Sequence, residues 1–236
     1  MQPMLLNAFS DFGETLYENL IAEDRYKMIL QGFGNTLLMA IGATLIGVAI
    51  GLVIAIVKYF ASGNKKLWIL DKLCDVYITV IRGTPIVVQL LIMYTAIFAA
   101  ASNGLPVAIL AFGINSGAYV AEIIRGGIFA VDKGQTEAGR SLGLNKIQTM
   151  RHIILPQAFK NFLPALGNEF IALLKETSVA GYIAVRDLTK AADLIRGRTF
   201  NSTSLFTVAL IYLLLVMVMT KGLKILERRL SKNDKR

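Results

Sequence analysis

Three long stretches of this chain contain no Asp, Glu, Lys or Arg. They cover residues 28–57, 83–121 and 199–220. A helix that crosses a bilayer needs about 20 mostly apolar residues, so the first and third stretches can each form one such helix and the second can form two. The whole chain is 55% hydrophobic and 17% charged, whereas an average soluble domain is about 25% charged. The pattern excludes an ordinary soluble domain and predicts an all-α membrane protein.

The breaks in these stretches define the expected helices. Ser102, Asn103 and Gly104, with Pro106 after them, form the polar, turn-forming break in the second stretch. A less apolar segment that contains charged residues is expected to cross the membrane as a further span. The five predicted spans lie near residues 28–57, 84–101, 105–124, 159–183 and 199–220. Residues 28–222 then form a transmembrane domain, between a first segment, 1–27, and a basic tail, 223–236.

The first segment carries apolar residues at intervals of three or four, with acidic residues between them. This spacing is typical of an amphipathic helix, which would either lie in the outer membrane interface or extend the first span as a packing element. The segment lacks the basic start and apolar stretch of a cleaved signal peptide. The spaced apolar residues are Leu5, Phe9, Phe12, Leu16 and Leu20.

The distribution of basic residues predicts the orientation. The net charge is +9, from 25 basic and 16 acidic residues, and the basic residues gather within 58–82, 125–160 and 221–236. Such clustering in loops indicates membrane topology rather than nucleic-acid binding. By the positive-inside rule these regions are cytoplasmic, so we expect the N-terminus outside and the tail inside, against anionic lipid headgroups. Four basic residues within 184–198 are an exception to the rule.

Several kinds of chemistry have no residues to support them. Cys74 is the single cysteine and His152 the single histidine, so the sequence predicts no internal disulfide, no metal site and no catalytic histidine. The chain has no glycine-rich phosphate-binding loop of the GxxxxGK[ST] type, so ATP energy would have to come from a partner. In the first span, Gly42, Gly47 and Gly51 are interpreted as positions of close helix packing.

The connection between the third and fourth spans, residues 125–158, carries the most informative pattern. Its centre reads Glu-Ala-Gly-Arg-Ser-Leu-Gly-Leu from Glu137, and Ile-Ile-Leu-Pro ends at Pro156. We expect two short helices separated at Gly143, lying on the membrane and presenting a surface to a cytoplasmic partner. The pattern resembles the EAA loop of the membrane subunits of bacterial ABC importers. The residues in register with that loop are Glu137, Ala138, Gly143, Ile153, Leu155 and Pro156, while Gly139 stands where alanine is usual.

Three further motifs are similar to those of permeases for polar amino acids such as histidine, arginine, lysine and glutamine. They are Arg82-Gly-Thr-Pro85, Ala118–Gly127 and Leu174–Ser178. The first could equally be a plain helix start with proline in its first turn, and Glu122 and Arg125 in the second could simply neutralise each other. From about Gly34 to its end, the chain resembles a five-helix permease of the type I ABC importer kind.

The resemblance implies a set of partners in a bacterial cell membrane. It implies ABC ATPase subunits that bind ATP and magnesium, a second permease subunit that is identical or related, and an extracytoplasmic solute-binding protein. The chain itself would need no cofactor and would not be an enzyme. It would pass an amino acid across the membrane by alternating access, driven by ATP hydrolysis in its partner.

A carboxylate within the fourth predicted span is the main candidate for substrate binding. An ionisable group at that depth costs at least ~2.5 kcal/mol unless a cavity or a partner receives it, so Glu169 either binds substrate or pairs with a basic residue of a neighbouring helix. In the third span Asn115 and Tyr119 are four residues apart, with Ser116 beside them, so they share one side of the helix. They could also serve helix-to-helix hydrogen bonds. We predict a pocket of Asn115, Ser116, Tyr119 and Glu169.

Two other classes of protein compete with the importer interpretation. A secondary transporter driven by an ion gradient would also carry a buried carboxylate, but such folds usually contain internal repeats, and none is visible. A purely structural scaffold would have no use for the patterned loop. A carboxylate in the pocket favours a cationic amino acid, although it could equally meet the α-ammonium group of glutamine.

Overall fold

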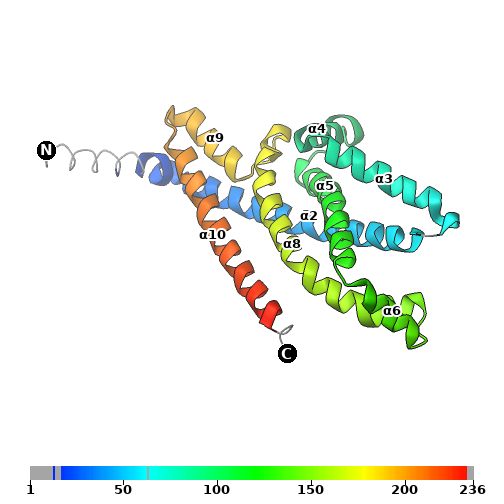
Figure 1. Ribbon diagram of the computed structural model, residues 1–236. Coiled ribbons are helices and arrows are strands. Elements are labelled where there is room, and N and C mark those ends of the chain that lie inside the picture. The colour runs from blue at the N-terminus through cyan, green and yellow to red at the C-terminus, as the bar shows by residue number, and fades with distance from the viewer. Residues whose placement is uncertain (1–12, 14–16, 63, 233–236) are drawn as a thin grey trace.

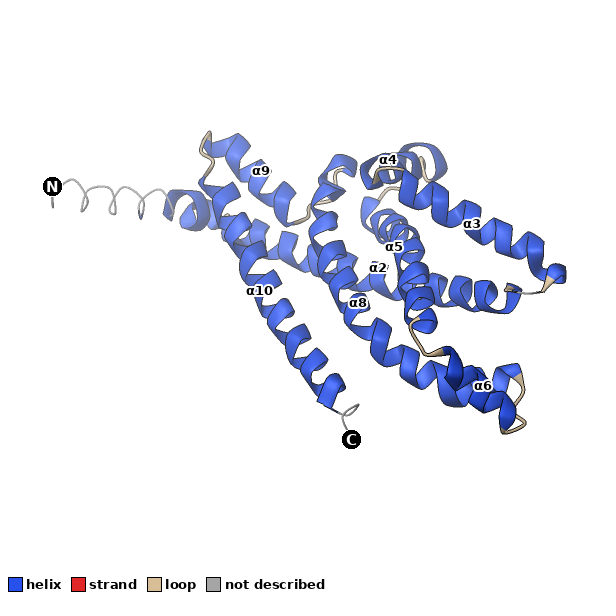
Figure 2. Cartoon of the chain, viewed as in Figure 1, coloured by secondary structure: helices blue, strands red, loops and turns tan. Residues whose placement is uncertain are grey.

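The computed structural model describes residues 13, 17–62 and 64–232. Figure 2 shows these residues as helices joined by short loops, with no strand among them. Of the apolar residues in the expected amphipathic helix, Leu5, Phe9, Phe12 and Leu16 lie outside the described residues, as does the end of the basic tail, 233–236. The helical class predicted by the sequence is confirmed.

Two long helices, α2 (Tyr26–Ala61) and α5 (Gly104–Phe129), cross at the centre of the molecule (Figure 1). Glycines let their backbones approach closely. A Cβ atom added to Gly47 would lie 3.0 Å from Cβ of Ser116, and one added to Gly51 would lie 2.5 Å from Cγ1 of Val120. The interpretation of these glycines as packing positions is confirmed.

The structure differs from the expected span 84–101. Helix α3 (Trp68–Gly83) ends before Thr84, which is extended. Helix α4 (Ile86–Ile92) follows, and a π-helical turn, Met93–Ile97, continues it. The segments 65–83 and 86–97 are bent by 106°. Proline disfavours helical geometry in the residue before it and has no N–H to donate, so Pro85 separates the two helices.

Helix α3 occupies residues that the sequence analysis assigned to a cytoplasmic loop because they are charged. Lys58 at the end of α2 forms ion pairs with Asp71 and Asp75, at 3.0 and 2.6 Å. These pairs bring α3 back along α2 and leave the apolar side chains of α3 on its other side, where Trp68 and Leu73 are exposed. The charges of α3 therefore do not prevent a helix that packs against the bundle.

The fourth and fifth expected spans also have different bounds. Helix α8 (Leu155–Glu176) begins before residue 159 and continues as a 3-10 turn, Thr177–Ile183. Helix α9 (Leu188–Thr199) precedes α10 (Thr203–Lys232). Phe200 ends α9 in the left-handed region at φ 53°, so the last span starts at Thr203, and good helix formers such as Lys, Arg and Leu extend it into the basic tail.

The described residues contain three helices that are long and apolar enough to cross a membrane alone, or four spans if the bent pair counts as one. The three are the helix that contains α2, helix α5 and residues 203–230 of α10. Helix α8 is not among them, and its 22 residues include Lys160, Glu169, Lys175 and Glu176. Its place in the bundle comes from its packing along α5.

Two short helices, α6 (Lys133–Ser141) and α7 (Lys146–Thr149), lie between α5 and α8. Figure 1 places α6 at the end of α8 opposite to α9. Gly143 joins the two short helices at φ +77°, a conformation that glycine adopts without strain. The structure thus contains the two short helices expected around Gly143.

Candidate functional site

The predicted pocket carboxylate lies where α5 and α8 meet. The Ser116 hydroxyl donates a hydrogen bond to Oε1 of Glu169 at 2.9 Å. Ser116 is buried and Glu169 is half-buried. No Lys or Arg of the described residues forms an ion pair with Glu169, so within this part of the chain the alternative of a structural ion pair has no partner. Among the described residues the carboxylate has one hydrogen-bond donor, Ser116, and it can accept further hydrogen bonds.

Asn115 makes its contact on a different side of α5, toward α4. Its Nδ2 donates to Oε1 of Gln89 at 3.0 Å, and Nε2 of Gln89 donates to the carbonyl oxygen of Ile81 at 2.7 Å and to Oγ1 of Thr84 at 2.7 Å. Gln89 therefore bridges the end of α3, the bend and the middle of α5. The sequence analysis did not single out Gln89, although a glutamine in an apolar stretch four residues after Pro85 is a usable signal.

Tyr119 belongs to a charged cluster formed by α3 and α5. The guanidinium of Arg82 lies 5.2 Å from the centre of the Tyr119 ring, within the range of a cation–π interaction. Nη1 of Arg82 is 3.8 Å from Oε2 of Glu122, and Nη2 of Arg125 is 2.8 Å from the same oxygen. The interpretation that Glu122 and Arg125 neutralise each other is confirmed, and Arg82 joins them.

The predicted pocket residues therefore divide into two groups in this structure. Ser116 and Glu169 are in direct contact between α5 and α8, whereas Asn115 and Tyr119 face α3 and α4. The turn of the helix explains this division, because adjacent residues of an α-helix point about 100° apart. The sequence analysis placed Ser116 on the same side of the helix as Asn115 and Tyr119, and it could not assign the neighbours of these residues.

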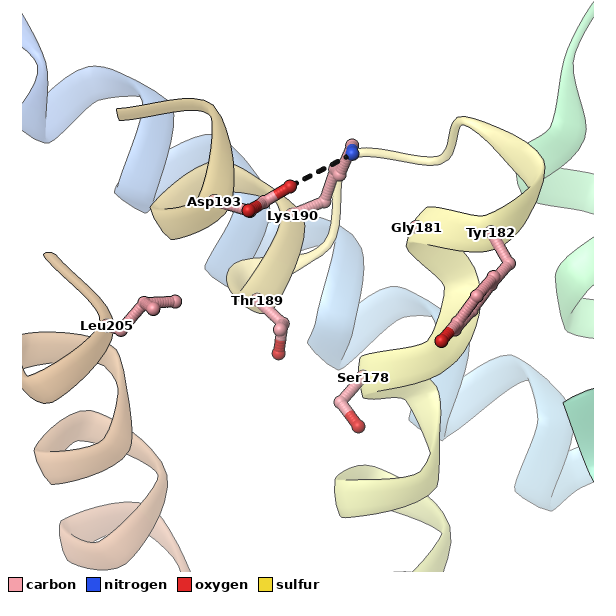
Figure 3. Close-up of a pocket in the computed structure, with 7 residues that line it drawn as sticks. All are labelled: Ser178, Gly181, Tyr182, Thr189, Lys190, Asp193 and Leu205. Carbon is pink, nitrogen blue, oxygen red and sulfur yellow. Dashed lines mark hydrogen bonds and ion pairs between the residues drawn. The ribbon is translucent and has the colours of Figure 1, made fainter. Parts of the chain in front are cut away.

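A separate pocket of about 350 Å³ lies at the end of the bundle near α9 (Figure 3). Lys190 and Asp193 form an ion pair across 3.2 Å at its edge. The predicted pocket residues of α5 and α8 do not line it. The residues that line it are Ser178, Gly181, Tyr182, Thr189, Lys190, Asp193 and Leu205.

The short helices at the other end expose an apolar surface. Leu142 is 78% exposed and Ile147 is 64% exposed, and Glu137 and Ala138 are exposed beside them. Apolar residues of this size on a loop outside the helix bundle indicate a protein contact. The segment therefore offers a surface of the kind that a cytoplasmic protein could cover.

The remaining loop residues of the EAA-like pattern fix the short helices to α8. Gly139 is buried, and an added Cβ would lie 2.7 Å from Cγ2 of Thr149 and 3.0 Å from Cδ1 of Ile153. A side chain at Gly139 would crowd Thr149 of α7 and Ile153 of the π-helical turn that follows, so glycine fits this position of the pattern. Leu155 and Pro156 form the exposed first turn of α8.

The helical bundle with its short external helices is the fold of ABC importer permeases. It is similar to a solved amino acid ABC transporter with histidines, with a TM-score of 0.79 and 43% identity over 86% of this chain and 94% of that chain. It also shares its fold with the inward-facing MetNI methionine ABC transporter, with a TM-score of 0.75 and 20% identity over 89% of this chain and 99% of that chain.

Residues 47–232 match the family of binding-protein-dependent transport system inner membrane components, and the chain belongs to this family. It is 38% identical over 210 residues to the arginine transport system permease protein ArtQ of Bacillus subtilis (strain 168), which covers 87% of this chain and 94% of that protein. It is 40% identical over 199 residues to the glutamine transport system permease protein GlnP of Escherichia coli (strain K12), covering 82% of this chain and 90% of that protein.

Family membership establishes the role of the chain. It is a multi-pass transmembrane subunit of an ABC importer, it is not an enzyme, and the ATPase is a separate subunit. The interpretation as a permease of the amino acid ABC transporter class is confirmed, and a secondary transporter driven by an ion gradient is not supported.

Proposed function

We propose that this permease carries a cationic amino acid, and that Ser116 and Glu169 contact its positive group. The observation that supports this is the half-buried Glu169 carboxylate, which has Ser116 as a hydrogen-bond donor and no ion-pair partner among the described residues. A cation that binds beside the carboxylate would compensate its charge and lower the cost of burying it. The names of the relatives include arginine and glutamine, so glutamine, bound through its α-ammonium group, is the second candidate.

Asn115 and Tyr119 complete the proposed pocket in a different state of the bundle. In this structure Gln89 occupies the Asn115 amide and Arg82 covers the Tyr119 ring. If α3 and α4 move relative to α5, both groups become available to the carboxylate and the polar atoms of an amino acid. In this proposal, alternating access exchanges Gln89 and Arg82, the internal partners of Asn115 and Tyr119, for the substrate.

The ATPase subunits are proposed to bind the exposed surface of α6 and α7, through Glu137, Ala138 and Gly143, while Ile153, Leu155 and Pro156 link that surface to α8. The ATPase would bind ATP and magnesium, and a second permease, identical or related, would complete the translocation path. A solute-binding protein would deliver the amino acid from outside. In this proposal the N-terminus lies outside and the basic C-terminal tail lies in the cytoplasm, as the distribution of basic residues predicts.

The substrate proposal is tested by Glu169→Gln in the reconstituted transporter. The change keeps size and most hydrogen bonding but removes the charge, and a charge-assisted hydrogen bond is worth ~1.5–3 kcal/mol. Uptake of arginine should weaken by roughly ten- to a hundred-fold. Glu227→Gln, on α10, removes a carboxylate elsewhere and is the control. A normal transport constant together with a lower melting temperature would assign Glu169 a structural role instead.

The docking proposal is tested by Leu142→Ser, which removes an exposed apolar side chain from the external surface. Co-purification of the ATPase subunit and ATP-driven uptake should both fall, while the amount of inserted permease stays the same. Lys133→Ser, an exposed change at the start of α6, the helix that ends just before Leu142, should retain both. Full ATPase retention by Leu142→Ser would contradict the docking surface.

The orientation is tested with single cysteines at Ser62 and Ser102 in a chain that lacks Cys74. An impermeant thiol reagent added to intact cells should label the cysteine at position 102 and leave the one at position 62 unmodified. Labelling at position 62 alone would reverse the proposed topology.

A further inference from the structure

A hollow of about 590 Å³ lies between the end of α2 and the two short helices. Its wall includes two cationic side chains, Arg140 and Lys146, together with Tyr59, Asn145 and Thr149. None of the described residues that line it is acidic, and no carboxylate of the described residues forms an ion pair with Arg140. The hollow therefore carries an uncompensated positive charge.

Thr149 gives this hollow a second feature, which surface charge alone would not supply. Its side chain is buried, with 1% exposure, and its Oγ1 has no hydrogen-bond partner among the described residues. A buried hydroxyl without a partner costs free energy, so the absence of an acceptor requires an explanation. Because Oγ1 is itself buried, the Thr149 side chain must rotate toward the hollow before its hydroxyl can donate to a ligand oxygen there.

The walls of the hollow are held in place by short-range contacts. Asn145 and Gln148 form a reciprocal capping box at the start of α7. Nζ of Lys146 lies 4.8 Å from the ring centre of Tyr59 and 5.5 Å from that of Phe60, and it donates to the carbonyl oxygen of Tyr59 at 3.3 Å. An ammonium group has three donors, so Lys146 keeps capacity for a ligand while it joins the loop to α2.

The position of the hollow indicates the source of the ligand. Tyr59 and Phe60 lie in the last turn of the apolar helix α2, and aromatic residues at the end of a spanning helix mark the headgroup level of a bilayer. Two cations and a hydroxyl donor at that level match the phosphate of a lipid. We propose that this hollow binds a phosphate group, supplied by the headgroup of an anionic phospholipid.

The experiment compares lipid binding by the full chain, purified together with its co-purifying subunits. After exchange into nanodiscs of phosphatidylcholine with or without phosphatidylglycerol, native mass spectrometry counts the retained lipid. Each cation near an anionic headgroup contributes about five-fold in affinity, so Arg140→Gln should reduce phosphatidylglycerol retention by about that factor. Lys66→Gln, an exposed change in the 3-10 turn that follows α2, should leave it unchanged.

Thr149→Val separates binding from folding, because it replaces the hydroxyl by a methyl group of similar size. In phosphatidylcholine alone it should leave the melting temperature unchanged or higher, since a hydroxyl without a partner is removed. With phosphatidylglycerol present it should lower lipid retention. If Thr149→Val and Arg140→Gln both retain phosphatidylglycerol as the parent chain does, the proposal is overturned.

Two further arms identify the source of the anion. Inorganic phosphate added to phosphatidylcholine nanodiscs, against chloride at equal ionic strength, tests for a free anion. If phosphate raises the melting temperature of the parent chain but not that of Thr149→Val or Arg140→Gln, the hollow binds soluble phosphate and the lipid source is wrong. Loss of the ATPase subunit from Arg140→Gln, with no effect of either phosphate source on the parent chain, would overturn the proposal in favour of a protein contact.

Discussion

Substitution of Gly51 by alanine tests the packing that sets the whole bundle. A Cβ atom at this position would lie 2.5 Å from Cγ1 and 2.7 Å from Cβ of Val120, and 2.8 Å from the backbone nitrogen of Ala121. Carbon atoms in contact are normally about 3.5–4.0 Å apart. A rotation of Val120 cannot relieve the contact with the backbone of Ala121, so α2 and α5 must move apart by roughly an ångström.

The expected cost is that of overpacking a well-packed core, about 1–3 kcal/mol. Gly34→Ala is the matched control, because it makes the same change in the same helix where nothing lies within 4 Å of the added Cβ. The control should be neutral or up to about 1 kcal/mol more stable, since alanine favours helix more than glycine does. Reversible unfolding in mixed micelles measures both variants. Equal stability of Gly51→Ala and Gly34→Ala would refute the close contact between α2 and α5.

Three further changes test local features. Gln89→Leu removes the bridge across the bend and leaves the Asn115 amide without its acceptor. The melting temperature should fall by the equivalent of about 1–3 kcal/mol. An unchanged melting temperature would show that the bend does not depend on Gln89. Hydrogen bonds from Arg196, the larger effect, and from Lys190 lower the pKa of Asp193. The ionised carboxylate therefore stabilises the fold above pH ~4, and this stabilisation is lost as the pH falls through the lowered pKa. The melting temperature of the parent chain should therefore approach that of Asp193→Asn in acid. At neutral pH the two should differ in stability by at most about 1 kcal/mol, because the pair is exposed. A difference in melting temperature that does not change with pH would contradict the assignment. Gly143→Ala should destabilise the short helices by about 1–2 kcal/mol, because φ is +77°. Gly143→Asn should destabilise them less, because asparagine tolerates the left-handed region better than alanine does. Limited proteolysis of residues 133–149 in the two variants tests that order.

The sequence by itself determined the class of the protein. Long uncharged stretches require burial in a bilayer, whatever their packing, and the spacing from Glu137 to Pro156 identified the permease family before any contact was known. The two short helices were also predictable, because Gly143 interrupts a helical pattern and Asn145 can cap the next turn. These features depend on local chemistry, which one segment carries alone.

The charged segment before Pro85 shows where sequence reasoning stopped. The basic residues within 58–82 made residues 65–83 look like a cytoplasmic loop. The ion pairs of Asp71 and Asp75 with Lys58 join residues that are 13 and 17 positions apart in the chain, which the sequence does not reveal. Without that partner the charges appear unsuited to a helix beside the bundle. The tertiary structure supplies the partner and with it the helix.

Only the tertiary structure decided which polar groups meet. Helical periodicity predicted that Asn115 and Tyr119 share a side, but not that this side faces Gln89 and Arg82 while Ser116 faces Glu169. The Asn115 contact spans 26 residues and the Ser116 contact spans 53. Such pairs follow from the rotation and separation of whole helices, and these are set by glycine contacts between α2 and α5 that no single segment can specify.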